Sequence, residues 1–109
     1  TLSALGEKIS RTLLRKPMMI GDRNKIIRQI AWCTGAAQSY FEAAIQQGVD
    51  AFITGEISEQ SVHAARESGV AFIAAGHHAT ERYGVQALGD HLAQKFGIQH
   101  QFIDIENPV

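Results

Sequence analysis

The feature that most constrains this sequence is an alternation of short apolar segments with longer amphipathic segments. The apolar segments are bounded by glycine-containing turns and are short enough to be buried β-strands. Short strands that alternate with helices predict right-handed crossovers and a mainly parallel sheet with helices on both faces. We therefore expect an α/β fold with three α/β/α layers.

The individual elements can be assigned from the spacing of apolar residues. Helices are expected at 2–16, 39–48 and 58–69, and a further helix follows the loop at 76–78 and reaches residue 95. Strands are expected at 26–34, 51–54, 70–75 and 98–105, and a short apolar run occupies 18–20. Ser39 and Glu42 fit a capping box, Ser58 fits an N-cap, and Gly48 and Gly97 fit left-handed C-caps.

The larger apolar side chains indicate what the core contains. Trp32, Phe52 and Phe72 lie within expected strands and are predicted to be core residues. Cys33 is expected to be a packed core thiol and not a nucleophile. One face of the last helix carries four apolar residues, namely Val85, Leu88, Leu92 and Phe96.

Length and composition exclude several classes of protein. A chain of 109 residues suits one domain, expected over 1–109, that needs no disulfide to fold. A net charge of -1 argues against a basic nucleic-acid-binding surface, so no direct DNA binding is expected. No apolar run approaches the roughly 18 residues of a membrane span, and no signal-peptide pattern opens the chain. With a single cysteine, we expect a cytoplasmic protein.

Three loops are the places where chemistry is expected. In an open parallel sheet, ligands bind outside the carboxyl ends of the strands. The loops at 34–39, 54–58 and 76–81 follow successive expected strands and carry many of the polar side chains.

The segment from Gly76 to Glu81 is the strongest candidate. His77 and Glu81 are four residues apart, so they stack on one helical face and can converge on one divalent cation. The alternative is that His77 or His78 caps the helix while Glu81 is a solvated first-turn carboxylate, which the helix dipole favours.

The other two loops are weaker candidates. Glu56 follows a buried strand and is either a general base, a partner of a ligating histidine, or an exposed loop carboxylate. His63 either points back to this loop or is an ordinary helix residue. The loop at 35–39 either receives an anion on its amides or is a tight strand-to-helix turn.

Three longer motifs overlap these loops, namely Ile-Ala-Trp-Cys-Thr-Gly at 30–35, Gly-Val-Asp-Ala-Phe-Ile-Thr-Gly-Glu at 48–56 and Ala-Gly-His-His-Ala-Thr-Glu-Arg at 75–82. They resemble the dinuclear-metal-centre family, which is also named GTP cyclohydrolase I type 2 or NGG1-interacting-factor-three-like. The ending Phe-Ile-Asp-Ile-Glu-Asn-Pro at 102–108 also resembles bacterial members. The resemblance covers essentially the whole chain.

The resemblance implies two divalent metal ions, held between two similar α/β halves of a protein about twice this length. On this basis the chain corresponds to the second, C-terminal half, and the upstream metal-binding half is absent. His77 and Glu81 would be metal ligands, Glu56 and His78 neighbours of the site, and His63 a pocket residue. Members form toroidal hexamers, so a homohexamer is expected of the full-length protein.

Three functions remain open. The first is a metal-dependent hydrolase acting on a nucleotide or another phosphorylated ring compound, with Glu56 as the candidate catalytic residue. The second is a non-catalytic metal-binding scaffold that forms ring-shaped oligomers. The third is a nucleotide-binding module without metal. A histidine and carboxylate set suits zinc, iron or manganese.

Overall fold

The computed structural model describes residues 1–109 and contains one four-stranded sheet. Its strands are β1 (Met18–Ile20), β2 (Ile30–Trp32), β3 (Ala51–Thr54) and β4 (Ala71–Ala74), in the order β1-β4-β3-β2. β2, β3 and β4 are parallel, whereas β1 pairs with β4 in the antiparallel direction. The prediction of a mainly parallel α/β sheet is confirmed.

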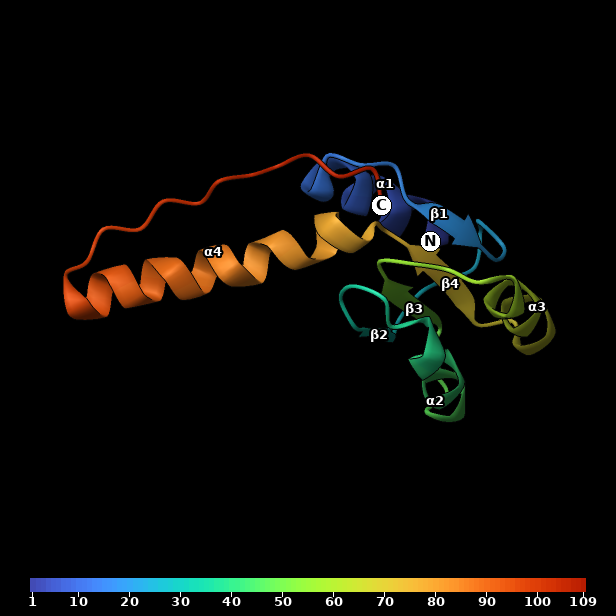
Figure 1. Ribbon diagram of the computed structural model, residues 1–109. Helices are drawn as coiled ribbons and strands as arrows, with labels where there is room; N and C mark the ends of the chain where they lie inside the picture. The colour runs from blue at the N-terminus through green and yellow to red at the C-terminus, as the bar shows by residue number, and fades with distance from the viewer.

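Helices cover both faces of the sheet (Figure 1). α1 (Leu2–Leu13) lies on one face, while α2 (Phe41–Gln46) and α3 (Glu59–Ser68) lie on the other. Successive strand residues point to opposite faces. Ala71 and Ile73 therefore pack under α1 with Leu2, whereas Phe72 packs toward α2 and α3. The expected α/β/α layering is confirmed.

Three phenylalanines form the centre of the larger core. The Phe72 ring meets the Phe41 ring edge-on, with centroids 4.8 Å apart, and the Phe52 ring lies 5.7 Å from Phe72. Phe52 and Phe72 are buried, as predicted. The prediction for Trp32 is wrong, because 70% of this residue is exposed. β2 is an edge strand, so no further strand or helix of this chain covers the indole.

The strand expected at 26–34 is shorter in the structure, and Asp50 explains why. Its Oδ2 accepts hydrogen bonds from the backbone N–H groups of Arg28 and Gln29, at 2.8 and 2.9 Å. These two amides, followed by Lys25, hold the pKa of Asp50 below its ordinary value. Because these two amides bind a side chain, they do not donate to the ladder, and only the Gln29 carbonyl accepts a backbone bond there, from the Asp50 amide at 2.9 Å.

Several predicted helix ends differ in detail. The capping box at Ser39 is wrong, because the 3-10 helix η1 (Gln38–Tyr40) precedes α2 and neither has a side-chain cap. Ser58 is the N-cap of α3, but its hydroxyl bonds the Ser61 hydroxyl and not the backbone. Gly97 ends α4 with a φ of 66°, as predicted.

The last helix, α4 (His77–Phe96), projects away from the sheet (Figure 1). The molecule is therefore elongated, with extents of 51 × 25 × 24 Å. None of the helices, α4 included, combines the length and the hydropathy that a membrane-spanning helix requires.

The strand predicted at 98–105 is wrong. Residues 97–109 form an irregular segment that runs back beside α4 toward α1 (Figure 1). Ile103 and Ile105 are 72% and 75% exposed, since no strand lies alongside to pair with this backbone. The predicted apolar face of α4 is also largely uncovered, because Val85, Leu88 and Phe96 are exposed.

Candidate metal centre

The three strand-end loops meet at one edge of the sheet. The Gly55 N–H donates to the Gly35 carbonyl, and the Gly76 N–H donates to the Gly55 carbonyl, both at 2.9 Å. β1 is antiparallel, so its beginning lies at this same edge, with Met18 opposite Ala74. The prediction that the loops share an edge is confirmed.

Two threonines join these loops through their hydroxyl groups. Thr54 is fully buried, donates to the Gly35 carbonyl at 3.0 Å and accepts from the Ala37 amide. Thr80 accepts from the Gly35 amide and donates to the His77 carbonyl, both at 3.0 Å. The Gly35 and Ala37 amides therefore already have partners, which favours a tight turn over an open anion site in the loop at 35–39. Neither threonine was selected from the sequence, although Thr54 ends an apolar strand, which is a usable signal.

His77 has a carboxylate at each ring nitrogen. It is the first residue of α4, and its Nδ1 lies 2.6 Å from Glu56 Oε1. Its Nε2 lies 3.1 Å from Glu81 Oε2, one helical turn further along. The structure therefore brings together Glu56, His77 and Glu81, which were all selected from the sequence and which come from the loops at 54–58 and 76–81.

The charge around the imidazole raises the pKa of His77 above its ordinary value of 6.5. The hydrogen bond to Glu56 is the largest cause, partial burial opposes it, and the charge of Glu81 adds to it. A protonated His77 is thereby stabilised between the two carboxylates.

Glycine is required at the position facing these side chains. Gly35 has a φ of +69°, and a Cβ atom there would collide with Glu81 Oε1 and lie 3.2 Å from His77 Nε2. Gly55 is similarly restricted, because a Cβ atom would lie 2.6 Å from the His77 Cα. The two glycines allow β2 and β3 to approach the start of α4.

The donor set fits part of a metal site. Two ligands of one tetrahedral zinc ion, each at roughly 2.0–2.2 Å from it, lie roughly 3.3–3.6 Å apart. His77 Nε2 and Glu81 Oε2 are close to this separation at 3.1 Å, and Glu56 on Nδ1 is the outer carboxylate that commonly orients a ligating histidine. No group of three or more His, Cys, Asp or Glu side chains in residues 1–109 could hold a metal ion.

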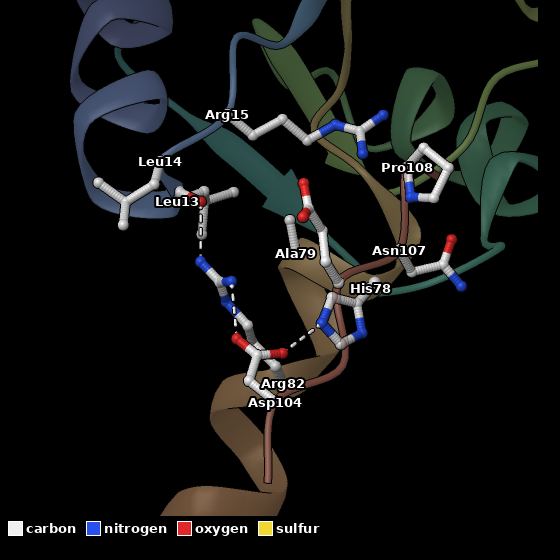
Figure 2. Close-up of a pocket in the computed structure, with 10 residues that line it drawn as sticks. Leu13, Leu14, Arg15, His78, Ala79, Arg82, Asp104, Asn107 and Pro108 are labelled. Carbon is white, nitrogen blue, oxygen red and sulfur yellow. Dashed lines mark hydrogen bonds and ion pairs between the residues drawn. The ribbon is translucent and has the colours of Figure 1, made fainter.

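His63 and His78 form their ion pairs with carboxylates outside this centre. The His63 side chain is 62% exposed on α3 and lies 4.0 Å from Glu59. His78 Nε2 faces Asp104 Oδ1 at 2.8 Å, and Arg82 binds both Asp104 and the Leu13 carbonyl (Figure 2). His78 therefore holds the C-terminal segment in place, and neither histidine contacts His77 or Glu81 through an ion pair.

Two cations near the centre were not selected from the sequence. Arg15 packs against Gly76, where a Cβ atom would lie 2.8 Å from its Cδ and Nε. Arg15, Lys16 and Glu56 line one groove of about 460 Å³. The sequence pattern predicted Arg15 and Lys16 only as the end of a helix. Their place beside the centre depends on the antiparallel direction of β1, which the pattern did not predict.

Comparison with known proteins identifies the family. The family model of Duf34/NIF3 (NGG1p interacting factor 3) matches residues 1–108. The chain belongs to this family. The Duf34/NIF3 relatives include the GTP cyclohydrolase 1 type 2 homolog of Pseudomonas aeruginosa, which is 64% identical over 94 residues, covering 86% of this chain and 37% of the relative. The homolog of Allochromatium vinosum is 53% identical and covers 99% and 42% respectively.

A solved structure shows the same Duf34/NIF3 fold. Protein ybgI, described as of unknown function, superimposes with a TM-score of 0.95 at 49% identity, over 99% of this chain and 44% of that chain. A further match is the protein TTHA1606 from Thermus thermophilus, with a TM-score of 0.83 at 25% identity, over 96% of this chain and 42% of that chain. The chain spans less than half the length of the relatives described here.

Proposed function

We propose that this chain supplies one side of a dinuclear metal centre in a metal-dependent hydrolase. The substrate class is a nucleotide or a related phosphorylated ring compound. The observation that carries the proposal is His77, whose two nitrogens face Glu56 and Glu81 at 2.6 and 3.1 Å. Family membership supports it, since relatives bear the name GTP cyclohydrolase 1 type 2 homolog.

His77 and Glu81 are the residues of this chain that would hold metal. Bound zinc, iron or manganese would supply a Lewis acid and a water that ionises near neutral pH. Two protein ligands do not complete such a site, so the remaining ligands are expected in the part of the longer protein that lies outside these 109 residues. Metal binding to this chain alone is accordingly expected to be weak.

Glu56 is the candidate proton-transferring residue. Its carboxylate holds the proton of His77 Nδ1, which fixes the tautomer that leaves Nε2 free to act as a ligand. The same carboxylate lines the groove with Arg15 and Lys16, so it is within reach of a small molecule in that groove. Arg15 and Lys16 place two positive charges where a substrate phosphate would lie.

The proposed setting is a cytoplasmic homohexamer of the full-length protein. A second candidate function is a non-catalytic metal-binding scaffold in the same ring-shaped assembly. This candidate rests on the same pair of side chains, because the geometry of His77 and Glu81 bears on metal binding and requires no substrate.

Nucleotide turnover separates the two functions. The metal-loaded full-length protein is incubated with GTP and related nucleotides, and products are followed by liquid chromatography. The hydrolase predicts metal-dependent turnover that Glu81→Gln abolishes. Glu59→Gln is the matched control, since Glu59 is a 92% exposed carboxylate on α3, and it should leave turnover unchanged. Nucleotide binding without turnover would favour the scaffold.

A further inference from the structure

An apolar groove beside the candidate metal centre has no part in the function derived so far. We call it the indole groove. It has a volume of about 370 Å³ and lies along the end of β2 and the neighbouring end of β3. Its lining contains no charged side chain and consists of Ile30, Trp32, Cys33, Thr34, Ile53, Thr54 and Thr80.

Trp32 provides the largest exposed aromatic surface of this groove. The indole is 70% exposed, although the neighbouring rings Phe52 and Phe72 are buried. An exposed indole offers a large, rigid, flat surface, and such surfaces stack planar heteroaromatic rings. The edge position of β2 keeps this ring face open within the chain.

The indole groove adjoins the candidate metal centre. Thr34 and Thr80 line it and immediately precede Gly35 and Glu81. A Cβ atom at Gly35 would meet both the Glu81 carboxylate and His77 Nε2, so this glycine separates the groove from the two proposed ligands. A molecule in the groove therefore lies next to them.

The sheet order places two cationic side chains on one side of His77 and an apolar aromatic ring on the other. Arg15 and Lys16 precede β1 at one edge, and Trp32 ends β2 at the other. Three strand spacings, or roughly 14 Å, separate these edges. His77 follows β4 and Glu56 follows β3, so both lie between the cations and the indole.

We propose that Trp32 is a specificity-determining residue, on which a planar heteroaromatic ring of the substrate stacks. This role rests on the proposed function, which places the reacting group of the substrate beside His77 and Glu81. It adds that the site selects its substrate by the ring. The ring occupies the indole groove, whose uncharged lining suits a ring and not a phosphate. The phosphate of the same molecule lies toward Arg15 and Lys16. The groove volume is within the range of roughly 300–1,000 Å³ typical of small-molecule sites.

The test compares a ligand that has a ring with one that lacks it. Binding of guanosine 5′-monophosphate and of ribose 5-phosphate to the metal-loaded full-length protein is measured by calorimetry. The variants are Trp32→Ala, Trp32→Phe and the control Tyr40→Ala. Tyr40 is a 63% exposed aromatic residue outside the indole groove. Circular dichroism and sedimentation velocity establish that each variant keeps its fold and its assembly.

Trp32→Ala should weaken binding of guanosine 5′-monophosphate by about tenfold to a hundredfold. Trp32→Phe should retain most of the affinity, and binding of ribose 5-phosphate should not change. Tyr40→Ala should leave binding of both compounds unchanged.

Four results would overturn the proposal. The first two are unchanged binding of guanosine 5′-monophosphate in Trp32→Ala and no such binding in the unaltered protein. The other two are an equal loss for both compounds and a change of assembly, which would make Trp32 a protein contact. Because binding is measured without turnover, a failure of the hydrolase is distinguishable: the ring-selective loss then persists in a protein that turns over no nucleotide.

Discussion

Glu56 and His77 are 21 residues apart in sequence, yet Glu56 Oε1 lies 2.6 Å from His77 Nδ1. The contact arises because β3 and β4 are adjacent parallel strands, so the residues that follow them leave the sheet at the same edge. It leaves Nε2 directed at Glu81. The pairing of one imidazole with two carboxylates is therefore a consequence of the strand order.

The pKa of His77 should depend on Glu56. In metal-free protein, that pKa is expected above 6.5 because Glu56 stabilises the imidazolium. Glu56→Gln removes the charge and should lower the pKa of His77, which is measured by following its ring protons by NMR against pH. Glu59→Gln is the control, since Glu59 does not contact His77. An unchanged pKa in Glu56→Gln would show that the contact is absent in solution.

The same shift makes stability depend on pH. The folded pKa of His77 is raised, so its contribution to stability is fully present below pH 6.5, the unfolded value, and is lost as pH rises through the folded pKa. Metal should compete with the proton, so metal affinity should rise over the same pH window.

Gly35→Ala should lower metal affinity in addition to lowering the stability of the fold. Its φ of +69° costs an alanine about 1–2 kcal/mol, and the new Cβ collides with the Glu81 carboxylate. Gly48→Ala is a matched control, because its φ is +70° and a Cβ there has no neighbour within 4 Å. Both variants should lose similar stability in thermal unfolding, but only Gly35→Ala should lose metal affinity in a chelator competition. Equal metal affinity in the two variants would contradict the assigned position of Glu81.

Phe72→Ala should destabilise the fold by about 3–5 kcal/mol, because it removes a fully buried ring from between Phe41 and Phe52. Phe72→Leu keeps most of the volume and should cost less. Urea unfolding measures both. A loss below about 1 kcal/mol for Phe72→Ala would mean that the three rings do not form the centre of the core.

Asp104→Asn should loosen the C-terminal segment. Asp104 binds His78 at 2.8 Å and Arg82 at 3.3 Å, and the His78 amide also donates to the Val109 carbonyl. Such partly exposed ion pairs contribute up to about 1 kcal/mol, so hydrogen exchange at the His78 amide should rise by up to about fivefold. Asp90→Asn, which removes only the contact with His100, should leave this amide unchanged. If the Asp104 variant exchanges no faster, the ion pairs do not hold the segment.

Sequence reasoning predicted the parts of the fold that local patterns determine. The buried strands β3 and β4 and the C-cap at Gly97 follow from apolar runs and from glycine geometry. The exposure of Trp32 could not be predicted, because it depends on β2 being an edge strand. The segment at 98–105 has an apolar pattern typical of a strand, but the chain places no strand beside it.

In the candidate site, too, the sequence predicted the local spacing of residues but not the contacts between loops. The four-residue spacing placed His77 and Glu81 on one helical face, and the structure confirms that geometry. The order of the strands, which the sequence pattern leaves open, decides that Glu56 reaches Nδ1 and that Arg15 packs on Gly76. His78 is adjacent to His77 in sequence but faces Asp104, since successive helical residues point in different directions.

Metal content is the most direct test of the central claim that His77 and Glu81 are metal ligands. Elemental analysis is applied to the purified full-length protein and to the double variant His77→Ala, Glu81→Ala. The control is the double variant His63→Ala, Glu59→Ala, which removes another histidine and glutamate four residues apart. We predict that the first variant loses bound metal while the control retains it. Metal at the unaltered stoichiometry in His77→Ala, Glu81→Ala would contradict the ligand assignment.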